Sequence, residues 1–282
     1  AQAVVKALFA DMEFARDVAL SPVNSINWAR VLAQAAYYVA SAAALAGAGP
    51  VSFTVPTGNF GDALAGDVAR RRGAPLGEVR LGTNANDSLT TALETGVFAA
   101  PASSAATLSP AMDVTAASNF ERIVFEAVGR DPEALRALYA AFAQGRRFEI
   151  PPAALEVLRA GFSGARADDA ATRAAMIDAR TRTGEVLCPH TAVGWHGRLR
   201  SAPGARVLLA TAHPAKFPAG SACSPIRTPR RGLRRSACGC ARAHAGKRRD
   251  RTGLRTSSSI WCSRAPAGAR RGRWPRRRRI AA

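Results

Sequence analysis

The residues whose types and spacing best suit ligand binding follow one short apolar run. The stretch Val51-Ser-Phe-Thr-Val-Pro-Thr-Gly-Asn-Phe-Gly-Asp62 passes from β-branched residues through Pro and two Gly into a helical pattern. The first N–H groups of a helix have no partner within it, and the helix dipole favours an anion beside them. Glycine lets the backbone approach such a guest closely. The stretch therefore predicts a phosphate-binding loop between a strand and a helix.

Two more polar loops follow strand candidates. Residues 82–87 come after a short apolar run at residues 79–81, and residues 211–216 come after residues 207–210. Ligands of parallel α/β sheets bind at the carboxyl ends of the strands. We therefore expect these loops and residues 56–62 to share one edge of a sheet.

The first 220 residues alternate between helical and strand patterns, which predicts the sheet that such loops need. Short strands spaced by helices are typical of an α/β fold with a helix-covered, mainly parallel sheet. Apolar spacing predicts helices at residues 1–19, 28–46, 62–72, 118–145, 151–161 and 193–199, with another opening at 168–175, and strands at 51–55, 79–81 and 207–210.

The charge is distributed unevenly. The 282 residues include 40 Lys and Arg against 20 Asp and Glu, a formal net charge of +20. Residues 221–282 hold 19 of these basic residues and a single acid, Asp250, so the preceding part is nearly neutral. The same segment has too few aliphatic residues to offset the entropy of ordering. We expect an α/β portion at residues 1–220 and a disordered, Arg-rich tail at residues 221–282.

Composition argues against several other classes of protein. No run of eighteen apolar residues is present, so no membrane span is expected, and the first residues lack the pattern of a secretory signal. Of five cysteines, only Cys188 precedes the tail, which is typical of a reducing compartment and predicts a cytoplasmic location. Cys238 and Cys240 lack a second ligand pair at zinc spacing, so no metal site is expected.

Six motifs occur in a fixed order along the chain. They are Asn24-Ser-Ile-Asn-Trp-Ala-Arg30, Pro56-Thr-Gly-Asn-Phe-Gly-Asp62, Thr83-Asn-Ala-Asn-Asp87, Thr107-Leu-Ser-Pro-Ala-Met-Asp113, Cys188-Pro-His-Thr-Ala-Val-Gly194 and Thr211-Ala-His-Pro-Ala-Lys-Phe217. With them, residues 1 to about 218 resemble threonine synthase, a pyridoxal-phosphate enzyme of the tryptophan-synthase-β-like fold. The resemblance covers roughly the second half of the family's usual length, so we expect a C-terminal portion of that fold.

The resemblance implies roles for particular residues. The loop of Gly58, Asn59, Phe60 and Gly61 corresponds to the family's cradle for the 5′-phosphate of pyridoxal phosphate. Thr211 corresponds to the hydroxyl that meets the pyridine nitrogen of the cofactor. The segment that binds the phosphate of the substrate corresponds to Asn24, Ser25, Asn27 and Arg30. A hydroxyl, amides and a guanidinium suit that task.

The implied reaction converts O-phospho-L-homoserine and water into L-threonine and phosphate, a carbon–oxygen lyase reaction of threonine biosynthesis. The family's lysine that forms a Schiff base with the cofactor lies in a Phe-His-Gly-Pro-Thr…Phe-Lys-Asp segment that this chain lacks. The three lysines present, Lys6, Lys216 and Lys247, stand in other contexts. We therefore expect no catalytic lysine and no activity unless the missing half is supplied, for example as a separately encoded N-terminal half.

Alternatives remain open at this stage. A related pyridoxal-phosphate-dependent phospho-lyase, acting on another γ-phosphorylated amino acid, would share the cofactor loop. A non-catalytic remnant is a second alternative, with nucleic acid or another polyanion bound only nonspecifically, through the basic tail. The tail's composition is also that of a GC-rich gene read out of frame, which favours a frameshift near residues 218–222.

Two histidines have two interpretations each. His190 follows Pro189 and is read either as a first-turn helix residue or as a site residue. His213 lies two residues after Thr211, where it either contacts the cofactor or orders its loop.

Overall fold

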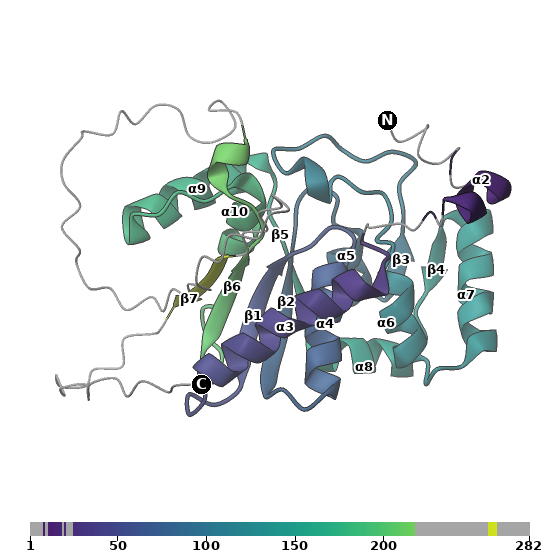
Figure 1. Ribbon diagram of the computed structural model, residues 1–282, viewed down its shortest axis with the longest axis horizontal. Helices are drawn as coiled ribbons and strands as arrows, with labels where there is room; N and C mark the ends of the chain where they lie inside the picture. The colour runs from purple at the N-terminus through teal and green to yellow at the C-terminus, as the bar shows by residue number, and fades with distance from the viewer. Residues whose placement is uncertain (1–7, 9–10, 19, 21–24, 218–258, 264–282) are drawn as a thin grey trace.

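The computed structural model describes residues 8, 11–18, 20, 25–217 and 259–263. A five-stranded sheet with the order β5-β2-β1-β6-β7 lies at its centre (Figure 1). The strands are β1 (Val51–Pro56), β2 (Leu76–Thr83), β5 (Phe162–Arg166), β6 (Arg206–Ala210) and β7 (Ser259–Ser263). Only β7 runs antiparallel to its neighbour. The predicted α/β class with a mainly parallel sheet is confirmed.

Helices cover both faces of the sheet, because side chains of successive strand residues point to opposite faces. Val207 and Leu209 of β6 join the larger apolar cluster, whereas Leu208 between them joins a second cluster with Trp195. The first cluster includes residues of α3 (Trp28–Ala44), α4 (Gly61–Arg71), α6 (Phe120–Ala127) and α8 (Pro152–Gly161). The second is formed with α9 (Asp169–Thr183) and α10 (Pro189–His196).

Smaller elements complete the described part. An antiparallel pair of strands, β3 and β4, lies beside α6 and α7 (Figure 1). The elements are α2 (Met12–Asp17), α5 (Ser88–Thr95), β3 (Val97–Ala99), η1 (Pro110–Met112), α7 (Pro132–Gly145), β4 (Arg147–Glu149) and η2 (Pro214–Lys216).

The three predicted loops leave the sheet at one edge. β1 is buried along its whole length, Ser52 and Thr54 included, as expected for a parallel strand with helices on both faces. Its last residue, Pro56, lies opposite Gly82 of β2, and Thr54 lies opposite Leu208 of β6. The N–H of Thr57 donates to the carbonyl of Gly82 (2.8 Å). The ends of β1, β2 and β6 therefore meet, and we call this side of the sheet the carboxyl edge.

Helix α10 packs directly against these strand ends because two glycines leave room for it. A Cβ atom on Gly194 would lie 2.7 Å from Cδ1 of Leu208 and 3.0 Å from Cγ of Pro56. A Cβ atom on Gly82 would lie 3.0 Å from the Cα of Gly194. Any side chain here would push the helix off the sheet. The first turn of α10 is thereby held at the carboxyl edge.

The structure differs from the sequence-based expectation at several elements. The pattern at residues 118–145 predicts one helix, but the chain forms α6 and α7, because Gly129 and Arg130 both adopt positive φ angles (73° and 62°). Helix α10 begins at Pro189, earlier than residue 193. Helix α5 and strand β5 are not predicted. Within residues 221–282, expected to be disordered, residues 259–263 form β7, and the others lie outside the described part.

Candidate functional site

The loop between β1 and α4 has an unusual backbone. Phe60 adopts a left-handed conformation (φ 64°), which is uncommon for a residue other than glycine. Its ring is buried, with its centre 5.7 Å from that of Phe120 and 5.3 Å from that of Phe162. No side chain caps the N-terminus of α4, so the amides of its first turn are available to a ligand. Strained backbone of this kind clusters at functional sites.

The glycines of this loop allow a close approach to the segment at residues 109–119. A Cβ atom on Gly58 would lie 3.0 Å from the Cα of Met112 and 3.1 Å from the carbonyl oxygen of Ala111. A Cβ atom on Gly61 would lie 3.3 Å from Nδ2 of Asn119. Consecutive amides in so compact a loop, at the start of a helix, fit the phosphate group of a cofactor.

Asn119 joins this loop to the turn before α3. It is fully buried, and its Nδ2 donates to the carbonyls of Ser25 (2.8 Å) and Asn59 (3.1 Å). Arg122 donates to Oδ1 of Asn119 (3.0 Å) and to the carbonyl of Ile26 (2.7 Å). The segments predicted to bind a cofactor phosphate and a substrate phosphate are thus brought together. Sequence reasoning missed Asn119 and Arg122, because neither belongs to one of the six motifs.

The predicted substrate-binding residues have different surroundings. Ser25 is half-buried beside the loop, and Arg30 is exposed in the first turn of α3. Asn27 caps that helix, since its Oδ1 accepts a hydrogen bond from the N–H of Ala29 (2.9 Å). Asn24 lies outside the described residues. The structure therefore places three of the four predicted residues next to the loop or on the adjoining helix end.

Asp62 follows the loop directly, in the first turn of α4. Its Oδ1 is shielded from solvent and has no hydrogen-bond partner among the residues that the structure describes. Its carbonyl accepts a hydrogen bond from the hydroxyl of Tyr38 (2.9 Å). Burial raises the pKa of Asp62 to about 7, and the positive charge of Arg30 opposes part of this rise. The sequence gives one indication of a functional role for Asp62, its position directly after Gly61.

A second polar cluster, from two of the motifs, lies at the same edge. Nδ2 of Asn84 donates to Oγ1 of Thr107 (2.8 Å), Oγ of Ser109 (3.0 Å) and Oδ1 of Asp113 (2.7 Å). Nδ2 of Asn86 also reaches Oδ1 of Asp113 (3.1 Å). Because these side chains satisfy one another, the cluster holds in place the segment that packs on Gly58.

His190 lies in the first turn of α10 and is buried, which agrees with its interpretation as a helix residue. Its Nε2 accepts a hydrogen bond from the N–H of Ala111 (3.1 Å). Its Nδ1 is buried without a partner in the described part of the chain. Burial lowers the pKa of His190 to about 4, and the charge of Lys216 adds to this, while Asp113 opposes it. The imidazole is therefore neutral at pH 7.

Thr211 is the exposed residue that follows β6. Its N–H donates to Oγ1 of Thr191 in α10 (3.3 Å), which ties the loop after β6 to that helix. His213 orders the same loop, since its Nδ1 accepts a hydrogen bond from the N–H of Ala215 (3.2 Å). Lys216 is exposed in η2, and Lys6 and Lys247 lie outside the described residues.

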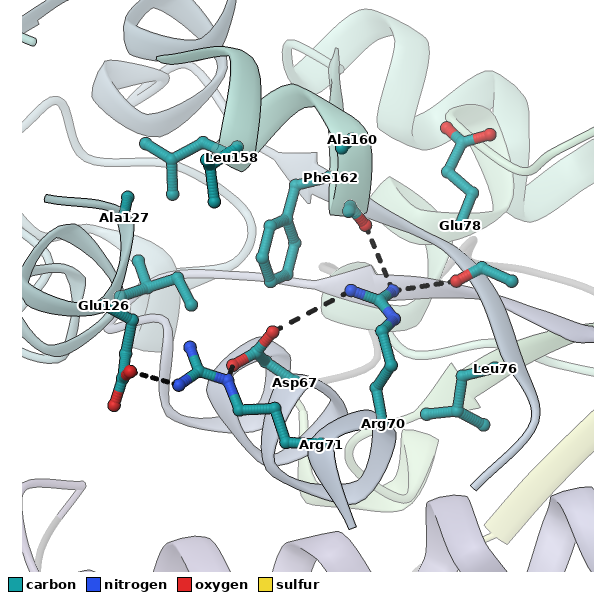
Figure 2. A pocket seen from close by; sticks show the side chains of 14 residues that line it. Asp67, Arg70, Arg71, Leu76, Glu78, Glu126, Ala127, Leu158, Ala160 and Phe162 are labelled. Atoms are coloured by element: carbon teal, nitrogen blue, oxygen red, sulfur yellow. Dashed lines mark hydrogen bonds and ion pairs between the residues drawn. The ribbon is translucent and has the colours of Figure 1, made fainter. Parts of the chain in front are cut away.

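A pocket of about 510 Å³ lies at the amino ends of β2 and β5, away from the carboxyl edge. Figure 2 shows Arg70 and Arg71 facing acidic side chains there. Nη2 of Arg70 donates to carbonyls at the start of β2 (2.8 Å) and the end of α8 (3.2 Å). Nε of Arg71 lies 2.7 Å from an oxygen of Asp67, and Nη1 of Arg71 pairs with Glu126. The protein itself satisfies these charges.

Two kinds of feature are absent from the described part of the chain. Across residues 25–217 and the shorter described stretches, no three His, Cys, Asp or Glu side chains are placed to hold a metal ion. No helix within the same ranges is long and apolar enough to span a membrane.

The chain is similar to threonine synthases, although no family model matches it. It is 39% identical over 237 residues to the enzyme from Eremothecium gossypii, covering 77% of this chain and 46% of that protein. The Pseudomonas aeruginosa enzyme is 38% identical over 221 residues, with coverages of 77% and 47%. The crystal structure of pyridoxal-phosphate-bound threonine synthase from Brucella melitensis superimposes with a TM-score of 0.74 at 42% identity, covering 81% of this chain and 50% of that one. The chain is therefore a homologue of threonine synthases that has their fold and spans about half of their length.

Proposed function

We propose that residues 1–220 form the part of a threonine synthase that binds pyridoxal phosphate and the substrate phosphate. The proposed reaction converts O-phospho-L-homoserine and water into L-threonine and phosphate. The observation that carries this proposal is the loop at residues 58–61, whose glycines fit closely against Met112 and Asn119. A homologous structure that contains pyridoxal phosphate supports the choice of ligand. The cofactor supplies the electron sink that proton removal beside a carbon–oxygen bond requires.

The residues of the chain suit separate tasks in this reaction. In the proposal, the amides of Gly58, Asn59, Phe60 and Gly61 hold the cofactor phosphate. The hydroxyl of Thr211 contacts the ring nitrogen. A neutral hydroxyl stabilises a protonated ring nitrogen less than a carboxylate does, and this sets how strongly the ring withdraws electrons. These assignments rest on the loop positions at the carboxyl edge and on the hydrogen bond that fixes Thr211 to α10.

The substrate phosphate has its own group of residues. We assign it to Ser25, Asn27 and Arg30, together with Asn24. A guanidinium in the first turn of a helix adds its charge to the helix dipole, which favours a dianion. Asn119 hydrogen-bonds to both segments, so it would fix the spacing between the cofactor phosphate and the substrate phosphate.

The lysine of the family's Schiff-base motif is not among these 282 residues. In the proposal, these residues alone do not turn over the substrate. Activity requires a threonine-synthase segment that carries the lysine, either in the same polypeptide or as a separately encoded half. The tail at residues 221–282 takes no part in the reaction. A phospho-lyase acting on another γ-phosphorylated amino acid would use the same cofactor loop, and the choice of substrate separates the two functions.

The test uses the purified chain with pyridoxal phosphate. We expect the chain to bind pyridoxal phosphate and inorganic phosphate to compete with it. We expect no absorption band of a Schiff base, and no adduct on a single lysine after reduction with borohydride. Adding the lysine-bearing half of a homologous threonine synthase is expected to yield L-threonine from O-phospho-L-homoserine. A chain that binds no pyridoxal phosphate would contradict the cofactor assignment. A borohydride-fixed adduct on one lysine of the chain alone would contradict the assignment of the missing lysine.

A further inference from the structure

Asp62 lies beside both phosphate positions of the proposed function, and one of its carboxyl oxygens lacks a partner. Buried polar atoms are almost always hydrogen-bonded, yet Oδ1 of Asp62 is shielded without a partner in the described part. The residue follows Gly61 of the loop, and a Cβ atom on that glycine would lie 3.3 Å from Nδ2 of Asn119 and 3.6 Å from the carbonyl oxygen of Ser25. An incoming phosphate group would therefore bring negative charge close to this carboxyl group.

Among the residues that the structure describes, Arg30 is the charged side chain that acts on the carboxyl group of Asp62. Helix α3 contributes this arginine and the hydroxyl of Tyr38, which donates to the backbone carbonyl of Asp62. Gln34 of the same helix lies near the Cβ position of Gly61. The segment before α6 contributes the amide of Asn119, with Arg122 bonded to its far side. Arg30 is exposed, and it is also the guanidinium assigned to the substrate phosphate.

We propose that binding of a phosphate group at the loop of residues 58–61 is coupled to protonation of the Asp62 carboxylate. This inference rests on the proposed function. A carboxylate beside a phosphate dianion is destabilised by like charge. A substrate phosphate that engages Arg30 also removes the cation that favours the ionised form. The proton passes from solvent to the carboxylate, an O–H bond forms, and one negative charge leaves the site.

The environment of Asp62 in the free protein makes this coupling effective near neutral pH. Burial raises the pKa of Asp62 to about 7, so both protonation states are populated before the ligand arrives. Binding that raises this pKa further takes up the remaining fraction of a proton. Affinity is then highest at low pH and falls as the pH rises past the pKa of the free state. A carboxylate that stayed ionised in both states would give no such dependence.

The probe is pyridoxine 5′-phosphate, which has the phosphate but no aldehyde and so forms no Schiff base. Calorimetric titrations at pH 7.5 in two buffers of different ionisation enthalpy give the number of protons taken up. We expect the wild-type chain to take up about three-quarters of a proton more than Asp62→Asn, since about that fraction of a carboxyl group with a pKa of about 7 is ionised at pH 7.5. The ionisation of the probe contributes equally to both. Glu133→Gln, which removes an exposed carboxylate on α7, is the matched control and is expected to behave as wild type.

A second measurement does not depend on the variant. Methyl phosphate, whose phosphate is its only titrating group, is already a dianion between pH 7.5 and 9, and the affinity of the wild type for it is expected to fall by up to about tenfold per pH unit. Equal proton uptake by wild type and Asp62→Asn, or a wild-type affinity that stays level over this range, would overturn the coupling and leave the loop assignment intact. A wild-type chain that does not bind the probe would overturn the loop assignment and the coupling together.

Discussion

The two ends of the parallel strands differ in whether their polar side chains have partners. At the amino end, Arg70 and Arg71 are matched by carbonyls and by the carboxylates of Asp67 and Glu126 (Figure 2). At the carboxyl edge, Oδ1 of Asp62 and Nδ1 of His190 have no partner in the described part. An unpaired buried polar atom costs about 1–3 kcal/mol. The difference indicates that the amino end serves stability, whereas the carboxyl edge is arranged for a ligand.

Two other buried atoms without a partner lie on arginine side chains of the sheet. The Nε atoms of Arg80 in β2 and Arg206 in β6 are also buried without a partner in the described ranges. A guanidinium has further donors on its two terminal nitrogens, so one unused Nε–H leaves most of the group available. The contrast therefore rests on the carboxyl and imidazole groups.

The largest expected effect would come from breaking the carboxyl edge at Asn119. Asn119→Ala removes a fully buried side chain, takes the Nδ2 donor from the carbonyl of Ser25 and the Oδ1 acceptor from Arg122, and leaves the carbonyl of Asn59 only the backbone N–H of residue 119. The free energy of unfolding is therefore expected to fall by about 3 kcal/mol. Binding of pyridoxine 5′-phosphate should be lost with it. Urea denaturation and calorimetric titration measure the two effects. Ser118→Ala, which removes an exposed hydroxyl 3.3 Å from Oδ1 of Asn59, is the control. Equal stability of the two variants would contradict the linking role of Asn119.

The matching change at the amino end is Arg70→Met. It keeps much of the apolar stem but removes donors to two backbone carbonyls, and a loss of about 2 kcal/mol in the free energy of unfolding is expected. Affinity for the probe should not change. Arg130→Met, which removes an exposed ion pair to Glu126, should leave the free energy of unfolding almost unchanged, because solvent screens such pairs. A weakened affinity in Arg70→Met would remove the distinction between the two ends.

A smaller effect is expected for Gly58→Ala. The added methyl group would meet backbone atoms of Met112 and Ala111, and overpacking of this kind destabilises by about 1–2 kcal/mol. Because the shifted backbone is part of the loop, the affinity for pyridoxine 5′-phosphate should also fall. Gly145→Ala adds the same group at the end of α7, where only a side-chain carbon at 3.8 Å is near. It should not lower the free energy of unfolding, because alanine favours a helix more than glycine does, and it should leave the affinity unchanged. An unaltered affinity in Gly58→Ala would argue against the loop as the phosphate site.

The smallest effect is a pH dependence at His190. Its pKa is about 4 in the folded chain, against about 6.5 for an unperturbed histidine. Because the unfolded state takes up the proton first, stability is fully present above pH 6.5 and is lost as the pH falls toward 4. Between pH 6.5 and 5.5 this amounts to about 1 kcal/mol. Urea denaturation of wild type and His190→Gln at both pH values measures it. Parallel pH dependences would mean that His190 is charged or absent from the core.

Periodicity and turn residues made the framework of the sheet predictable. The run at residues 51–55 and the Gly-containing turn after it correspond to β1 and the start of α4. Two of the differences from the sequence-based expectation have local causes. Strand β5 reads Phe-Ser-Gly-Ala-Arg, with one large apolar residue. Helices α6 and α7 read as one because Arg130 gives no sign of its left-handed conformation.

The candidate site was predictable only where motifs mark it. The glycine loop, the segment at Ser25 and the position of Thr211 are visible in the sequence. Asn119 is not, because it acts through hydrogen bonds to carbonyls distant in sequence, and no spacing encodes such contacts. The unpartnered oxygen of Asp62 is likewise a result of three-dimensional packing and has no signature along the chain.

The buried ring of Phe60 has a consequence for the timing of ligand capture. Anchored between Phe120 and Phe162, it holds the loop in its left-handed turn before any guest arrives. A loop that is ordered beforehand loses little conformational freedom on binding. Encounter with a phosphate should then be a single-step, concentration-dependent process, without a slower rearrangement after contact.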